Sequence, residues 1–248
     1  MSNIAEVYYP PSAGVGIWAL QPGQLTDGLA HAALAIMTSA YEHQFEGPHT
    51  VTNLPHGAVK GHFRPDDSAS IRAQRERMAL SMEGGSTYWF AVVHGLGTKA
   101  VQGLNPIGLA KTSPSRPRHW RHQAAEEPNL YLNDIAVFPA MQLQGVATSL
   151  VHAATKYSDH DPGAHLVLDN IVGSPAGPWF RQLGLRPRRL TRVAPFEIGD
   201  QSIPQVRMQT RGGHLGGFIV GLEDRYPRLT TNISIVVSRS ESMPLEKG

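Results

Sequence analysis

The stretch from Val137 to Ala147 constrains the fold more than any other part of the chain. An apolar run of strand character, residues 130–137, leads into it, and a pattern of helical period, residues 146–157, follows it. A strand that runs into a helix places the free N–H groups and the partial positive charge of the helix start at the turn. Gly145 removes a Cβ where a phosphate would come close. The stretch therefore predicts a strand–turn–helix unit with an anion site, an ordinary tight turn being the alternative.

The elements expected around this unit alternate between helices and strands. Helical spacing predicts helices at 29–41 and 69–82, and Asp66-Asp67-Ser68 is expected to cap the second. The connection between strands at 88–93 and 106–111 holds three glycines, which favours an antiparallel hairpin. The remaining expectations are strands at 16–20, 165–168, 190–194 and 205–210, and a loop at 43–67.

Gln142, Gly145 and Ala147 have the spacing of a known signature. Gln142-x-x-Gly145-x-Ala147, after Val137-x-Pro139, resembles the acyl-CoA motif of the GNAT acyltransferase superfamily. That motif has Gln or Arg, two residues, Gly, one residue, and then Gly or Ala. The strand before it and the helix after it are the elements that the motif requires.

A second signature of the same family has a counterpart at residues 171–185. In relatives it reads Asn, two residues, Ala, two residues, Leu-Tyr, then Gly-Phe, and Ala176 and Gly184 match it here. The departures are Trp179 for Leu, Phe180 for Tyr and Leu185 for Phe. The Asn position falls on Gly173, or on Asn170 if the loop is longer, and the sequence does not decide between the two.

The resemblance covers residues 16–210 and implies an α/β domain with the GNAT fold. Such a domain has a mixed, splayed β-sheet flanked by helices on both faces. Residues 1–15 then form an irregular N-terminal arm, and residues 211–248 form a C-terminal extension with a strand-like run at 232–237. We expect the extension to pack against the core or a second subunit, which leaves a homodimer open.

The resemblance also implies that acetyl-CoA is a co-substrate. Main-chain N–H groups of the turn would hold the pyrophosphate, and the pantetheine arm would pair with the central strand where it bulges and splays near Val137. The N–H group at Val137 would face the thioester oxygen. The residues expected to bind CoA are Ile135, Val137, Gln142, Leu143, Gln144, Gly145, Val146, Ala147, Thr148, Asn170 and Phe180.

Acetyl transfer to an amine needs a proton acceptor, because a lysine-type amine with a pKa of ~10.4 is protonated at neutral pH. Strand alternation predicts one shared face for Tyr131, Asn133, Ile135 and Val137. Tyr131 and Asn133 stand where relatives carry Glu or His. Neither is a good base at neutral pH, so a water relay is expected. Asp134 is expected on the opposite face, in a structural role.

A proton donor for the departing thiolate is the second requirement. Phe180, where relatives have Tyr, cannot donate, so Ser174, Tyr131 or water are the candidates. If the Phe180 ring faces the CoA tunnel, Phe180→Tyr is expected to raise turnover about 10-fold. The function implied is transfer of an acetyl group from acetyl-CoA to a primary amine. A non-catalytic acyl-CoA-binding protein is the alternative that the missing acid and base favour.

The composition of the chain narrows the possible reaction types, cofactors and partners further. The chain has no cysteine, which excludes disulfides and a covalent cysteine intermediate, so direct attack in a ternary complex is expected. His119-x-x-His122 has no carboxylate at helical spacing, so no metal is expected. No signal peptide or membrane-spanning run is visible, and a cytoplasmic protein is expected. The net charge of +2 does not favour nucleic acid, although basic stretches at 111–122 and 186–192 keep acylation of aminoacyl-tRNA open.

Overall fold

The computed structural model describes residues 5–9, 15–46, 54–93, 106–114, 129–158, 160, 163–188, 193–210, 214–229 and 235–236. The strands are β1 (Ala5–Tyr9), β2 (Val15–Leu20), β3 (Thr87–Val93), β4 (Pro106–Ser113), β5 (Asn129–Val137), β6 (His165–Ile171), β7 (Leu185–Pro187), β8 (Phe196–Ile198), β9 (Gln201–Ile203), β10 (Gln205–Thr210) and β11 (Ile235–Val236). The helices are α1 (Asp27–Phe45), α2 (Ala58–Phe63), α3 (Ser68–Glu83), α4 (Val146–Tyr157), α5 (Ala176–Leu183) and α6 (Leu215–Arg225), with short 3₁₀ turns η1 (Pro22–Gln24), η4 (Pro139–Met141) and η5 (Pro227–Leu229).

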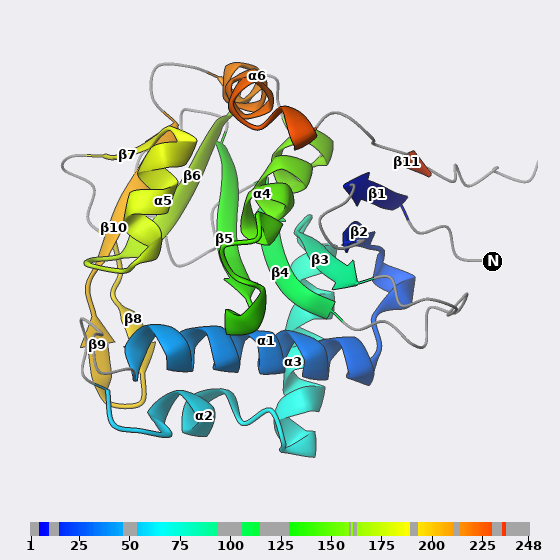
Figure 1. Ribbon diagram of the computed structural model, residues 1–248. Helices are drawn as coiled ribbons and strands as arrows, with labels where there is room; N and C mark the ends of the chain where they lie inside the picture. The colour runs from blue at the N-terminus through cyan, green and yellow to red at the C-terminus, as the bar shows by residue number, and fades with distance from the viewer. Residues whose placement is uncertain are drawn as a thin grey trace, which may run out of the picture.

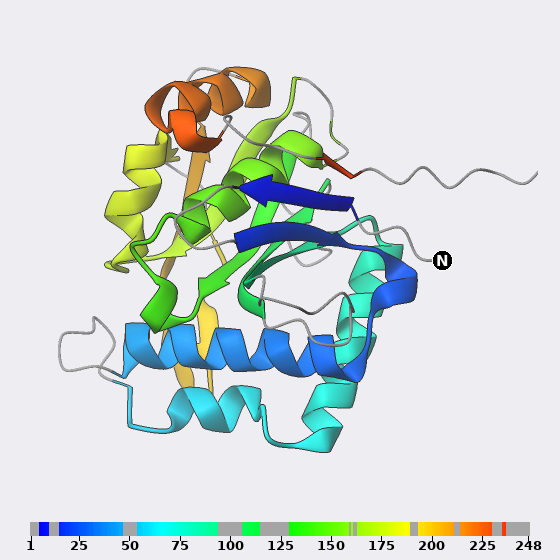
Figure 2. The same ribbon diagram turned by 45° about the vertical axis from the view of Figure 1, so that its right-hand side comes forward.

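The described strands form one nine-stranded sheet in the order β11-β1-β2-β3-β4-β5-β6-β10-β7, and β8 and β9 form a separate hairpin. Every pair in the large sheet is antiparallel except β5 with β6, so the sheet is mixed, as expected. The pairing of β3 with β4 confirms the predicted hairpin. Figures 1 and 2 show α1, α2 and α3 on one side of the sheet and α4, α5 and α6 on the other.

Two apolar cores lie on the two faces of this sheet. On one face, Leu34 and Met78 from α1 and α3 pack against side chains of β3, β4 and β5. On the other face, Leu150 of α4 and Leu183 of α5 pack against side chains of the same sheet, including those of β6. The bounds of α4 coincide with the predicted helix at 146–157. Helices on both faces confirm the layered architecture that the resemblance implies.

The expected loop at 43–67 contains a helix, so that expectation is wrong for Ala58–Phe63. The carboxylate of Glu46 accepts N–H groups from both Gly57 and Val59, each at 2.7 Å, and so fixes the first turn of α2. Gly57 caps α2 in the left-handed region, which glycine adopts without strain. A helix of six residues is too short to show a helical period in the sequence, which is why the pattern did not reveal it.

The first and last described strands, β1 and β11, pair at one edge of the sheet. β1 pairs with β2 and with β11, so the expectation of an irregular arm is wrong for Ala5–Tyr9. In the C-terminal extension, Leu215, Phe218 and Leu222 of α6 are buried in the core beside α4. The expected strand at 205–210 is β10. The one at 190–194 lies largely outside the described residues, and the described part, Val193 and Ala194, is not a strand.

No helix among the described residues has both the length and the apolar character that crossing a membrane requires. α6 packs into the core and β11 pairs with β1, so both belong to the same body as the sheet. The proposed domain boundaries at residues 15 and 210 remain predictions.

Candidate functional site

The main feature of the candidate site is an opening in the middle of the sheet, between β5 and β6. β5 and β6 are paired only over Asn129–Tyr131 and His165–Val167. Beyond these residues β5 continues to Val137 against β4 alone, and β6 continues to Ile171 against β10 alone. Figure 1 shows the two strands close together at one end and apart at the end nearer α1. The facing edges of β5 and β6 therefore carry backbone groups that no neighbouring strand uses.

The direction of the backbone groups of β5 follows from one hydrogen bond. Phe138 N–H donates to Ile107 O of β4 at 2.9 Å. Because N–H groups alternate along an antiparallel strand, those of Ile135 and Val137 point away from β4, into the opening. The side-chain amide of Gln142 donates to Val137 O at 3.1 Å, which satisfies the carbonyl on that side. Two N–H donors at Ile135 and Val137 are left facing the opening.

The bulge of the central strand lies at Asn133 and not near Val137 as expected. Lys111 of β4 stands opposite Asp134, and the next residue, Thr112, stands opposite Leu132, so Asn133 has no cross-strand partner. One extra residue reverses the alternation of side chains. Leu132 accordingly faces the α4 side and Ala136 the α1 side, although both positions are even.

This reversal corrects the predicted shared face of four residues. Leu130, Leu132 and Val137 lie in the core beneath α4, so Tyr131 lies on the opposite face from Val137. Ile135 packs against the same core as Val137. Asp134 therefore shares the α1 face with Tyr131, whereas the sequence placed the two on opposite faces.

The turn after β5 has the geometry of an anion site. Gly145 is the residue before α4 and has φ +83°, and a Cβ there would meet no atom within 4 Å. Leu143, fully exposed, also has a positive φ, +60°. No side chain caps α4, and within the described residues the backbone N–H groups of 143–148 bind no protein acceptor. Free donors and the positive end of the α4 dipole thus lie together at the surface.

The residues of the second motif pack beneath this turn. Trp179 Nε1 donates to Thr148 Oγ1 of α4 at 3.4 Å, and the Trp179 and Phe180 rings are 4.7 Å apart. Phe180 is 4% exposed and packs in the core, and its contact with CoA remains a prediction. Asn170 is also buried, and its Nδ2 donates to Ile171 O and lies against Gly177 of α5.

Phe180→Tyr is therefore expected to lower the melting temperature without raising turnover. A hydroxyl without a partner in the core costs about 1–3 kcal/mol, and each kcal/mol shifts the melting temperature by about 2–4 °C at this chain length. Phe196→Tyr is the control, because Phe196 is only partly buried. Unchanged melting with faster turnover would instead place the edge of the Phe180 ring at the ligand.

The three predicted catalytic residues are held by structural contacts. Tyr131 is 2% exposed. Asn133 Nδ2 donates to Ser113 Oγ at 2.8 Å and to the Tyr131 carbonyl at 3.4 Å. Ser174 Oγ, beyond the end of β6, accepts from Gln44 Nε2 at 2.8 Å and from Ala176 N–H at 3.1 Å, which links α1 to the start of α5.

Asp134 is the titratable group that sequence reasoning missed. Its side chain is partly exposed, and burial raises its pKa, while the positive charge of Lys111 acts in the opposite direction. Burial, and then the negative charge of Asp134, raise the pKa of Tyr41. An acidic residue inside a largely apolar strand was the available signal, since perturbed carboxyl groups gather at functional sites.

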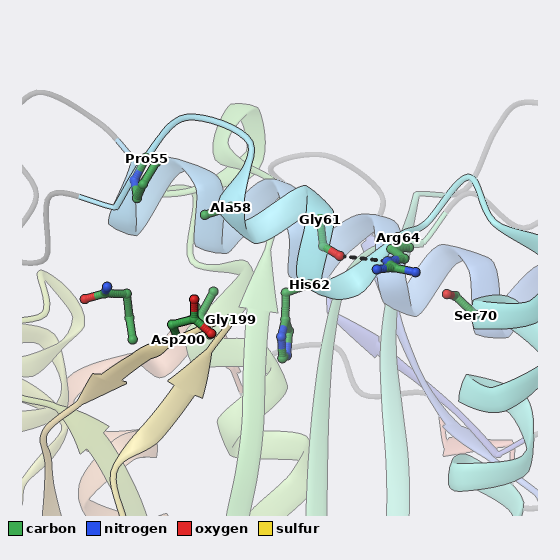
Figure 3. Close-up of a pocket in the computed structure, with 10 residues that line it drawn as sticks. Pro55, Ala58, Gly61, His62, Arg64, Ser70, Gly199 and Asp200 are labelled. Atoms are coloured by element: carbon green, nitrogen blue, oxygen red, sulfur yellow. Dashed lines mark hydrogen bonds between the residues drawn. The ribbon is translucent and has the colours of Figure 1, made fainter.

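A pocket of about 630 Å³ lies elsewhere, between α2 and the β8–β9 hairpin. Figure 3 shows His62 reaching from α2 towards the hairpin that carries Asp200, and Arg64 bonded to the carbonyl of Gly61. Burial, and then the charge of Arg77, lower the pKa of His62. Because α2 lies on the side of α1 away from β5 (Figures 1 and 2), this pocket is separate from the opening in the sheet.

The described residues include no group of three or more His, Asp or Glu side chains that could hold a metal ion. His119 and His122 lie outside the described residues, as do most of the basic stretch at 111–122 and part of the one at 186–192. The expectations of no metal and of a role for the basic stretches therefore remain predictions.

No protein-family model matches the chain, and no curated protein matches it. Solved structures do resemble it. A GCN5-related N-acetyltransferase from Rhodopseudomonas palustris is 18% identical, with 78% of this chain and 93% of that chain covered and a TM-score of 0.47. A chimera of the spermidine N-acetyltransferase SpeG from Vibrio cholerae and hSSAT is 15% identical, covers 84% of this chain and 99% of that chain, and has a TM-score of 0.48. The PaiA N-acetyltransferase from Thermoplasma acidophilum, in complex with coenzyme A, is 11% identical, covers 78% of this chain and 98% of that chain, and has a TM-score of 0.46.

The assignment of the fold depends on how the strands and helices of this chain are arranged. A mixed sheet carries helices on both faces, and its parallel strands β5 and β6 part in the middle. A strand–turn–helix unit with Gln142 and Gly145 lies beside the opening. This is the architecture that the two sequence motifs imply, and the chain has the GNAT fold.

Proposed function

We propose that the protein transfers an acetyl group from acetyl-CoA to a primary amine. The observation that supports this most directly is the opening between β5 and β6, which ends at the uncapped start of α4. The N–H groups of residues 143–148 suit a pyrophosphate, and the free edge of β5 suits the amide groups of a pantetheine arm. Acetyl-CoA presents these two features in one extended molecule.

The reaction is a direct attack. The amine nitrogen, once neutral, adds its lone pair to the thioester carbonyl carbon, and the C–S bond then breaks. Negative charge develops on the carbonyl oxygen, and the N–H group of Val137 or Ile135 is the donor available in the opening to stabilise it. The nitrogen loses its second proton and the thiolate gains one, through water, because Phe180 has none to give. No cysteine is present for a covalent intermediate.

A non-catalytic acyl-CoA-binding protein is the second candidate, and the packed environments of Tyr131, Asn133 and Ser174 favour it. Acylation of aminoacyl-tRNA is the third candidate carried over from the sequence, and it rests on basic stretches that lie largely outside the described residues. Both are outcomes of the same experiment.

The experiment has two measurements. Calorimetry with CoA tests the binding site, and release of free CoA from acetyl-CoA in the presence of alkylamines, diamines, amino sugars and peptides tests transfer. Binding with amine-dependent release supports the proposal. Binding without release from any amine favours the non-catalytic candidate, and steeply salt-dependent binding of RNA favours the tRNA candidate. Absence of CoA binding overturns the proposal.

A further inference from the structure

The helix α6 has little helical stability of its own. Three of its 11 residues are glycines, Gly216, Gly217 and Gly221, and glycine stabilises a helix less than alanine does. The residue before the helix, His214, makes no capping bond with its side chain. A helix of this length is marginal in isolation. The position of α6 therefore depends on its contacts with the rest of the protein.

Polar contacts join α6 to the C-terminal parts of two other helices. Glu223 Oε1 accepts from His152 Nε2 at 2.9 Å and from Lys156 Nζ at 2.6 Å, both on α4. The guanidinium group of Arg225 donates to the carbonyl groups of residues 182 and 183 at the end of α5. Figures 1 and 2 show α6 across the ends of α4 and α5 that lie away from α1. α6 thus joins these two ends as a clamp.

The opposite ends of the same two helices border the candidate site. α4 begins after Gly145 with uncapped N–H groups, and α5 begins at Ala176, after the end of β6. Near these ends, Trp179 Nε1 of α5 donates to Thr148 Oγ1 of α4 at 3.4 Å. The clamp at one end of α4 and α5 and the anion site at the other end therefore share the same pair of packed helices.

His152 is the buried titratable group of the clamp, with a side chain that is 0% exposed. The titratable or charged residues of the two helices are His152, Lys156 and Tyr157 on α4 and Glu223, Asp224 and Arg225 on α6. The strands beneath α4 present apolar side chains to it. Burial lowers the pKa of His152, the bond to Glu223 acts in the opposite direction, and the charge of Lys156 acts with burial. His152 is therefore neutral at physiological pH.

We propose that α6 is a pH-sensitive clamp, which holds the ends of α4 and α5 together near neutral pH and is released in mild acid, when His152 takes up a proton. Release breaks the bonds of Glu223 to α4 and exposes His152 to water, where the charged imidazolium is solvated. CoA, bound at the start of α4, favours the clamped state, because that state keeps α4 and α5 in place. Only this last point rests on the proposed function.

The direction of the pH dependence follows from His152. Because its pKa is lowered in the clamped state, the released state binds more protons in acid. The clamped state therefore has its full stability above the ordinary histidine pKa of ~6.5 and loses stability as the pH falls below it. Burial acts to raise the pKa of Glu223, but the bonds from Lys156 and His152 outweigh it, and the pKa is lowered. Glu223 thus weakens the clamp only near and below its ordinary pKa of ~4.3.

Hydrogen exchange of the backbone amides of α6 measures its release. Between about pH 7.5 and about pH 5.5, the opening constant of α6, corrected for the intrinsic exchange rate, should rise by up to about 10-fold. This is the factor that a released imidazole with a pKa of ~6.5 supplies. Amides of β3 and β4 are the internal reference and should stay more protected than those of α6. His152→Gln should lose the rise, and the control His31→Gln, at an exposed position of α1, should keep it.

Glu223→Gln tests the bonds of the clamp without replacing His152. It removes the charged acceptor of Lys156, so the opening constant of α6 should rise by about 5-fold or more at both pH values. The further rise in acid should remain, because His152 is still present. This variant keeps the test decisive if His152→Gln does not fold. Unchanged opening in Glu223→Gln would contradict the clamp.

The remaining outcomes separate the clamp from the proposed function. Equal exchange of α6 and β3 would mean that α6 opens only when the whole protein unfolds, and a rise that His152→Gln retains would come from another group; either result overturns the clamp. With CoA at about 100 times its Kd, opening of α6 should fall by up to about 100-fold. If CoA binds and leaves the opening unchanged, the link between the clamp and the site is wrong. If no CoA binds, the proposed function fails, while exchange without ligand still decides the clamp.

Discussion

Gly145→Glu is expected to lower the affinity for CoA by at least about 100-fold. At φ +83° a residue with a Cβ costs about 1–2 kcal/mol, and the new side chain extends into the open space beside the helix start. A carboxylate about 4 Å from a pyrophosphate charge is repelled by about 4 kcal/mol at an effective dielectric constant near 20. Since about 1.4 kcal/mol is a factor of ten, repulsion alone exceeds the expected loss. Calorimetry with CoA measures it.

The chain offers a matched control for this variant. Gly199, in the turn between β8 and β9, also has a positive φ, +56°, and open space around its Cβ position. Gly199→Glu also places a side chain at a positive φ and adds the same charge away from α4, so CoA affinity should stay at the wild-type value. Gly145→Asn adds the side chain without the charge and should fall between the two. Unchanged affinity in a folded Gly145→Glu protein would remove the CoA site from this turn.

Local patterns were sufficient to predict the strand–turn–helix unit. The residues of α4 have a strong apolar stripe, and Gly145 stands where the backbone has to enter the left-handed region. Both signals lie within one stretch of chain, where sequence spacing and spatial neighbourhood coincide. The predicted bounds at 146–157 are those of α4. The sheet was predictable in the same way, because β3, β4, β5 and β6 are runs of apolar and β-branched residues.

The errors arose where structure depends on pairing between distant residues. The bulge at Asn133 exists only because β4 matches β5 in a particular register, and no pattern within β5 shows it. Its consequence was the wrong face for Asp134 relative to Tyr131. β1 likewise became a strand through pairing with β2 and with β11, and its partners in β11 lie about 230 positions away in the sequence. Which face of β5 each side chain occupies, and how β1 and β11 pair, could therefore be determined only from the structure.

Arg207→Met is expected to destabilise the fold by about 3–5 kcal/mol, because it leaves the Asp169 carboxylate buried without its partner. The two side chains, 3% and 6% exposed, stand directly opposite each other on β10 and β6. Arg207 Nε donates to Asp169 Oδ1 at 2.9 Å and Nη2 donates to Oδ2 at 3.0 Å, a bidentate pair. Thermal or denaturant unfolding measures the loss, which corresponds to about 6–20 °C in melting temperature.

The position of this ion pair gives the loss a functional meaning. Beyond Val167, β6 has parted from β5, so β10 is its only neighbouring strand among the described residues. The ion pair between Asp169 and Arg207 therefore stabilises the position of β6, which borders the opening on the side opposite β5. In Arg207→Met, backbone amides of residues 168–171 should exchange hydrogen faster than those of β5 near β4.

Replacing both partners, as Arg207→Met with Asp169→Leu, removes the unpaired charge and should recover most of the stability and of the protection from exchange. An apolar pair of similar volume often replaces a buried ion pair without loss of stability. A single variant that loses less than about 1 kcal/mol would mean that Asp169 finds water or another donor, and that the backbone ladder of β10 alone keeps the opening apart.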